Sequence, residues 1–200
     1  MTKFLPLFPL EMIVFPGEEL KLHIFEPRYK ELINECVETG RTFGIPPLIE
    51  KGVAEYGTEV KVVSVGAKGD NGEMDVTVIG LSVYKTLESL KTVPDKLYSA
   101  AIVADMENDI MVSAEMRSKL FSQIIKLAKH VKLDEGVLGK PQSIMAFDVA
   151  NQVGLDLMQK LDILSMVREK DRQTFIIQHL KLTIPIVKQA NKLQFRSFLN

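Results

Sequence analysis

Few residues in this chain have the types and spacing needed for metal binding or nucleophilic catalysis. It contains three histidines, His23, His130 and His179, and one cysteine, Cys36. No histidine has a cysteine or carboxylate partner at the spacing of a zinc site, so the sequence predicts no metal centre. We expect His23 to be a hydrogen-bonded structural histidine on a strand and Cys36 to be a buried thiol of the core.

Phosphate binding and peptide hydrolysis need other patterns, which the sequence does not contain. No G-x-x-x-x-G-K-[ST] motif occurs, and Gly139-Lys140-Pro141 offers a proline where a phosphate cradle needs a backbone N–H. The stretch from Gly66 to Gly72 holds Asp70 and precedes Glu73, which would repel a phosphate; its turn chemistry predicts a hairpin loop. No serine stands in a glycine-flanked setting beside a lysine. We therefore expect neither enzyme activity nor a cofactor.

The stretch from Phe4 to Leu32 has the least conformational freedom in the chain, because prolines and large apolar residues are dense in it. Pro16-Gly17 predicts a turn, since proline presets φ and glycine accepts a positive φ. Apolar residues then alternate with polar ones from Leu20 to Ile24, which predicts a strand. Pro27 suits the first turn of a helix whose core stripe follows helical spacing: Tyr29, Leu32, Ile33, Cys36 and Val37.

The remaining chain changes from strand-like to helical patterns near Glu107 to Ser113. The predicted strands are Phe43 to Ile49, Glu59 to Val65, Met74 to Ile79, Ser82 to Leu87 and Leu97 to Ala104. Val62-Val63 predicts a bulge or burial on both faces. The predicted helices are one capped by Ser113, one starting near Gln142, a short one from Leu155 to Leu164, and a long one from about Glu169 towards Phe195, bent at Pro185. We expect an α+β chain in two parts, residues 1–109 and 110–200.

The first third also carries a family resemblance. Its motifs are Phe8-Pro9-Leu10, then Val14-Phe15-Pro16-Gly17, then Leu20-x-Leu22-His23-Ile24-Phe25-Glu26-Pro27-Arg28-Tyr29. This combination resembles the signature of the N-terminal, substrate-recognition domain of Lon proteases. The resemblance implies a PUA-like small β-barrel with one early helix and a helical subdomain behind it. It also implies a role in contacting polypeptides instead of cutting them.

The sequence departs from the family pattern at one place. Family members usually carry an arginine and an aromatic residue after the glycine that corresponds to Gly80, and the matching positions here are Val83 and Tyr84. Any function of that arginine is therefore not transferred to this chain. We also expect Glu26 to favour the helix N-terminus electrostatically and Arg28 to make a local salt bridge, so most motif residues should be structural.

The resemblance implies a binding surface, and helical periodicity suggests where it lies. The polar face of the helix after Pro27 and an exposed Phe15-Pro16 tip are the expected contacts, with these candidate residues: Phe15, Pro16, Arg28, Lys30, Glu31 and Glu35. The expected function is non-catalytic recognition of unfolded or degron-bearing polypeptides, or of a protease or chaperone partner.

Charge is unevenly distributed and leaves an alternative open. Met1 to Val112 holds 11 Lys and Arg against 18 Asp and Glu, a net −7, whereas Ser113 to Asn200 holds 14 against 8, a net +6. The two parts should attract each other. The basic part is either a solvated helical surface or the site of a PUA-like nucleic-acid-binding protein. Scarce aromatic residues and the absence of tryptophan disfavour RNA binding. A hydrolase without recognisable motifs is a third alternative, to be tested by ATPase and peptidase assays.

The overall composition is that of an ordinary globular protein, and 200 residues can bury a core without disulfides. A single cysteine suits a reducing compartment. The N-terminus lacks the basic region and apolar core of a signal peptide, and no stretch reaches the roughly 20 apolar residues that span a bilayer. We expect a cytoplasmic protein.

Overall fold

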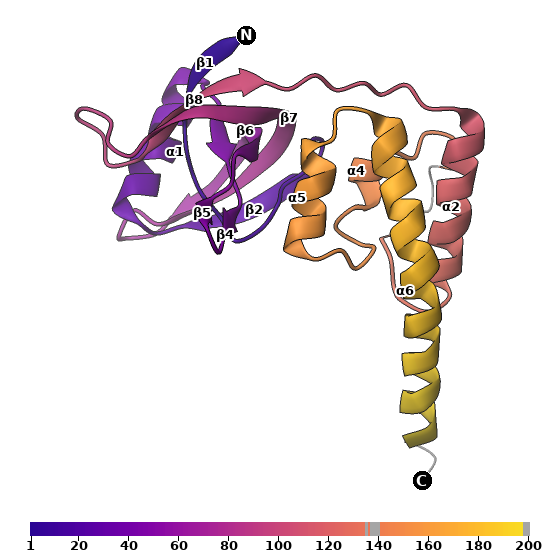
Figure 1. Ribbon diagram of the computed structural model, residues 1–200. Helices are drawn as coiled ribbons and strands as arrows, with labels where there is room; N and C mark the ends of the chain where they lie inside the picture. Colours follow the sequence, from indigo (N-terminus) through magenta and orange to yellow (C-terminus); the bar gives the residue numbers. More distant parts are fainter. Residues whose placement is uncertain (135, 137–140, 198–200) are drawn as a thin grey trace. The chain divides into compact units, whose positions relative to one another are not determined.

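The computed structural model describes residues 1–134, 136 and 141–197, which form two compact units, Met1–Glu107 and Asn108–Asn200 (Figure 1). The first unit holds the strands and one helix, and the second is helical. The predicted α+β class is confirmed. Gly139 and Lys140, considered above for a phosphate-binding motif, lie outside the described residues.

The first unit is built on an antiparallel sheet with the strand order β1-β8-β7-β6-β3, to which β2 adds by pairing with the first part of β7. Its strands are β1 (Thr2–Pro6), β2 (Glu19–Ile24), β3 (Phe43–Ile45), β6 (Tyr56–Lys68), β7 (Met74–Leu90) and β8 (Ala100–Asp105). Just after β1, Leu7 forms a parallel bridge with Gly44 of β3. This bridge joins the two ends of the sheet and closes it into a small barrel.

Strand β7 differs from the prediction of two separate strands, Met74 to Ile79 and Ser82 to Leu87. It runs unbroken from Met74 to Leu90 and pairs with β2, β6 and β8 along its length. Glycine marks a close approach here and not a strand end, because a Cβ at Gly80 would stand 2.3 Å from the carbonyl oxygen of Phe15. The register shift between Val62 and Ser64 confirms the predicted bulge.

Prolines divide another predicted strand, Phe43 to Ile49. Pro46 and Pro47 cannot donate to a ladder, so the stretch forms β3 and a separate strand, β4 (Leu48–Ile49), which pairs with β5 (Gly52–Val53).

Helix α1 (Pro27–Thr39) starts with Pro27 and ends at Gly40, whose φ of 71° is a left-handed cap. Its buried stripe is Tyr29, Leu32, Ile33 and Cys36, which pack against the sheet in the main core. Burial raises the pKa of the Cys36 thiol to about 11, so the predicted buried thiol is confirmed. The prediction was wrong for Val37, which is 51% exposed because it lies at the margin of the helical stripe.

The second unit consists of α2 (Ala114–Ala128), α4 (Ala146–Val149), α5 (Leu157–Ser165) and α6 (Glu169–Ser197). The Ser113 hydroxyl caps α2 by accepting from the N–H of Met116, as predicted. Helix α4 starts later than the expected position near Gln142, because the Asp148 carboxylate accepts from the N–H of Met145 and fixes the helix start there. No helix among the described residues is both long and apolar enough to cross a membrane.

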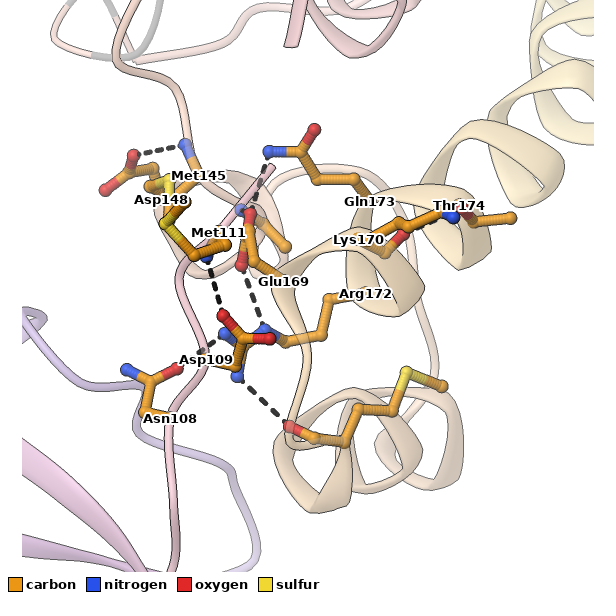
Figure 2. A network of polar contacts seen from close by, with 12 residues as sticks. Asn108, Asp109, Met111, Met145, Asp148, Glu169, Lys170, Arg172, Gln173 and Thr174 are labelled. Atoms are coloured by element: carbon orange, nitrogen blue, oxygen red, sulfur yellow. Dashed lines mark hydrogen bonds and ion pairs between the residues drawn. The ribbon is translucent and has the colours of Figure 1, made fainter. Parts of the chain in front are cut away.

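A buried ion pair organises the start of α6 (Figure 2). The Arg172 Nε donates to Glu169 Oε2 over 2.9 Å, and both side chains are almost fully buried. The same guanidinium donates to Asn108 Oδ1 over 2.6 Å and lies over the Phe147 ring, 4.2 Å from its centroid. The arginine thereby fastens the first residue of this unit to its helices.

The other carboxylate oxygen of Glu169 is also satisfied. Its Oε1 accepts from the N–H of Ala146, at the start of α4, over 2.6 Å and from Gln173 Nε2 over 2.8 Å. A parallel bridge between Asp109 and Arg168 completes the junction. One buried carboxylate thus joins α4 and α6.

Candidate polypeptide-binding surface

Of the aromatic residues in the N-terminal motif, Phe8, Phe15 and Tyr29 lie in the core, whereas Phe25 is exposed. The Phe8 ring stacks on Tyr29 with centroids 3.9 Å apart and lies 6.3 Å from Phe43. These three side chains connect the segment after β1, α1 and β3. They stabilise the scaffold and are not available to a ligand.

The expected exposed tip at Phe15-Pro16 is wrong for Phe15, which has 0% exposure. The predicted turn itself is confirmed, since Gly17 has a φ of 85° and the N–H of Glu18 donates to the Phe15 carbonyl over 3.1 Å. The turn folds onto β7, where the N–H of Gly17 donates to the Gly80 carbonyl over 2.9 Å. Phe15 is therefore buried by the barrel, and Pro16 is half-buried.

One flank of α1 is occupied by the segment that precedes β8. Glu35 accepts hydrogen bonds from Lys96 Nζ and from the hydroxyl of Tyr98, and Glu31 Oε2 accepts from the N–H of Leu97 over 2.9 Å. These two acidic residues, expected to contact a polypeptide, are already engaged within the unit.

The opposite flank of α1 contacts the hairpin between β6 and β7. Lys30 Nζ donates to the carbonyl of Asn71 over 2.7 Å, and Lys68 Nζ donates to Asn34 Oδ1 over 3.0 Å. The hairpin loop, predicted from its turn residues, is closed by a hydrogen bond from the N–H of Gly69 to the carbonyl of Glu73. Lys30 therefore also makes a contact within the unit, which holds the hairpin against α1.

The start of α1 leaves one cation exposed. Arg28 Nη2 lies 2.7 Å from Glu26 Oε2, which confirms the predicted local ion pair, and its guanidinium lies 4.5 Å from the centroid of the Tyr29 ring. The Arg28 side chain nevertheless remains half-exposed. Its planar face is held in place by the aromatic ring beneath it.

Two large apolar side chains near α1 are exposed to solvent. Phe25, just before the helix, is 58% exposed, and Leu97, beside Glu31, is 64% exposed. We call Phe25, Arg28 and Leu97 the α1 shoulder. The sequence pattern did not identify Leu97 as a surface residue, because it was assigned to a strand; it lies in the loop before β8.

The contact between Glu35 and Tyr98 predicts a pH-dependent stability. The Tyr98 hydroxyl, and then Lys96, hold the pKa of Glu35 below its ordinary value, about 4.3. The stability that the ionised Glu35 carboxylate contributes is complete above the ordinary pKa and is lost as pH falls through the lowered pKa. Tyr98→Phe should cost about 1 kcal/mol at pH 7 and flatten the fall of stability between pH 5 and pH 3, measured by urea unfolding. Equal slopes in both proteins would contradict this assignment.

His23 lies on the outer face of the sheet, and its Nδ1 is 2.9 Å from Asp75 Oδ1. It is hydrogen-bonded, as predicted, and exposed. It lines a shallow groove of about 440 Å³ with Lys21, Ser64 and Thr77. Among the described residues, no group of three His, Cys, Asp or Glu side chains is placed to hold a metal ion.

The departure at Val83, beside the retained aromatic residue Tyr84, places an apolar side chain on β7. Both side chains are buried, and Tyr84 packs with Leu5 and Leu7 in a second cluster of the core. Its ring fills the space where a Cβ at Gly57 would stand. The position of the family's usual arginine is thus held by a buried valine, Val83.

Comparisons with known proteins agree with this architecture. The chain is similar to a crystal structure of a Lon N-terminal domain protein from Xanthomonas campestris, with a TM-score of 0.66, 23% identity, and coverage of 88% of this chain and 98% of that one. It is also similar to the N-terminal domain of Mycobacterium avium complex Lon protease, with a TM-score of 0.72, 13% identity, and coverage of 90% and 98%. Residues 4–182 match the family model of the ATP-dependent protease La (LON) substrate-binding domain. The chain therefore belongs to the LON substrate-binding domain family.

Proposed function

We propose that this LON substrate-binding domain binds unfolded or degron-bearing polypeptide segments at the α1 shoulder, without catalysis of its own. The observation that carries the proposal is the exposure of Phe25 and Leu97 beside α1, whose Lys30, Glu31 and Glu35 side chains are engaged within the unit. Family membership supports a role in substrate recognition. A protease or chaperone that processes the bound segment is the partner we expect.

The chemistry of the α1 shoulder suits an unfolded chain better than a folded one. Unfolded segments expose apolar side chains, and burial of a large apolar side chain is worth about 1.5–3 kcal/mol. Arg28 adds a planar guanidinium whose N–H groups can donate to a carboxylate or a backbone carbonyl of the same segment. No rigid pocket is needed for such contacts, so many different segments can bind.

The proposal is tested with a reduced, alkylated and permanently unfolded test protein carrying a fluorescent label. The double variant Phe25→Ser/Leu97→Ser should weaken its binding to the purified chain about tenfold or more, measured by fluorescence anisotropy. The control Val63→Ser/Leu87→Ser removes two similarly exposed apolar side chains elsewhere in the first unit. The melting curves of both variants should match that of the parent protein. Equal affinity for all three proteins would refute the assigned surface.

A further inference from the structure

We propose that the second unit binds a second kind of polypeptide element, an acidic amphipathic helix, in a groove between α2 and α6. This inference adds a second binding surface to the proposed polypeptide recognition. It rests on the proposed function in one respect, that the ligand is a polypeptide. It names a structured element, whereas the α1 shoulder is assigned to unfolded segments.

The groove consists of two hollows that follow one another along the two helices. The first, about 410 Å³, is lined by Met111, Val112, Ser113, Met116 and Lys170. The second, about 420 Å³, is lined by Ser118, Lys119, Ser122, Gln123, Ile177 and Lys181. From the first hollow to the second, residue numbers rise on both helices, so α2 and α6 run parallel to each other along the groove. From Lys170 to Lys181 the groove is about 16 Å long, the length of a three-turn helix.

The floor of the groove includes apolar side chains, beside Ser118, Ser122 and Gln123 in the second hollow. Met116 and Ile177 contribute to it from the two helices, and Met111, 78% exposed, lies at one end beside exposed Ile110. Methionine side chains adapt their shape to different partners, and an exposed one at the mouth of an apolar hollow has little to contact within its own unit. A continuous apolar stripe on a partner helix would cover these side chains.

The rim of the groove is basic. Lys170 and Lys181 are exposed, and among the residues that the structure describes no carboxylate lies within ion-pair distance of either ammonium. Lys119 forms an exposed pair with Glu115 over 2.6 Å, which adds little stability and can exchange partners. Asn108 to Asn200 carries 14 Lys and Arg against 9 Asp and Glu, a net +5. Acidic residues beside the partner's apolar stripe would complement this rim.

A helix is favoured over the other ligands that such a surface could take. The groove walls are two helices whose backbone hydrogen bonds are internal, so they offer no unpaired edge to an added strand. No aromatic side chain lines either hollow as a stacking platform for a single-stranded nucleic acid. A helix with residues i, i+3, i+4 and i+7 apolar fits both the length and the floor.

The test uses the full chain and two labelled 14-residue helical peptides with the same leucine stripe, one flanked by glutamates and one by lysines. The glutamate peptide should bind at least tenfold more tightly than the lysine peptide at low salt, with the difference shrinking in 0.5 M salt. Lys170→Glu/Lys181→Glu should abolish that preference. Lys61→Glu/Lys91→Glu, the same charge change on exposed lysines of the first unit, should preserve it. Met111→Ser should weaken the binding of the glutamate peptide a few-fold without changing the preference for it over the lysine peptide.

Equal affinity of the parent chain for both peptides would overturn the inference. So would an equal loss of the preference for the glutamate peptide in Lys170→Glu/Lys181→Glu and Lys61→Glu/Lys91→Glu. If a single-stranded oligonucleotide displaces the labelled glutamate peptide and the unlabelled glutamate peptide does not, the groove is assigned to nucleic acid instead. The two proposals fail separately. Loss of unfolded-protein binding in Phe25→Ser/Leu97→Ser tests the α1 shoulder, and that variant should still bind the glutamate peptide normally.

Discussion

Arg172→Ala should lower the free energy of unfolding of the helical unit by about 3–5 kcal/mol, the largest effect expected of any substitution discussed. The substitution leaves the Glu169 carboxylate buried without its cation and removes the hydrogen bond that Arg172 donates to Asn108 Oδ1. It also removes the contact between the guanidinium and the Phe147 ring. Urea unfolding followed by far-ultraviolet circular dichroism measures the loss, because the second unit is helical.

A matched variant of an exposed arginine shows whether the loss of stability comes from the buried charge or would follow removal of any arginine in this turn. Arg168 and Asp171 form an ion pair of 2.7 Å in the same turn of α6, yet both side chains are exposed, so Arg168→Ala should cost no more than about 1 kcal/mol. Glu169→Gln/Arg172→Met should be more stable than Arg172→Ala, because no unpaired charge is left in the core. Similar losses for Arg168→Ala and Arg172→Ala would contradict this explanation.

Gly80→Ala should destabilise the barrel by about 1–3 kcal/mol, since the added Cβ would stand 2.3 Å from the Phe15 carbonyl oxygen. That oxygen belongs to the backbone of the turn and cannot move without displacing the turn from β7. Amide hydrogen exchange reports the displacement directly, because the N–H of Gly17 donates to the Gly80 carbonyl. The variant should lose protection at Gly17.

Gly69→Ala is the control for this prediction. A Cβ at Gly69 meets its first neighbour at 3.8 Å, an ordinary contact distance, so the hairpin should accept alanine with little change in stability. Unchanged protection of the Gly17 amide in Gly80→Ala would show that the turn stays on β7 despite the added Cβ, and would contradict this prediction.

Local patterns were sufficient to predict the elements of the first third. The alternation from Leu20 to Ile24, the turn at Pro16-Gly17 and the start of α1 at Pro27 all depend on neighbouring residues, and the structure contains each of them. The buried thiol of Cys36 followed from the same helical period. These features needed no knowledge of distant contacts.

The features that the sequence did not predict depend on distant contacts. Burial of Phe15 requires β7 to pass beneath the turn at Gly80, 65 positions later in the chain. Likewise, the N–H of Leu97 meets Glu31 across 66 positions, which turned an expected binding residue into a structural one. Helical periodicity showed that Glu31 leaves the core stripe of α1 but could not show which segment covers it.

The candidate surface was therefore predicted only in outline. Arg28 remains exposed at the start of α1, as the helical pattern indicated, while Glu31, Glu35 and Lys30 make contacts within the unit. The two exposed apolar residues that replace the expected tip lie in loops, where periodicity carries no information. Their role in polypeptide binding stays a prediction.

The most direct test of the account is a nuclear magnetic resonance titration of the ¹⁵N-labelled chain with the unfolded test protein. We predict that amide shifts concentrate at Phe25, Arg28, Leu97 and their immediate neighbours, while core amides such as those of Phe8 and Tyr29 change little. Absence of any shift at saturating polypeptide, or shifts confined to surfaces away from α1, would contradict the proposed recognition site.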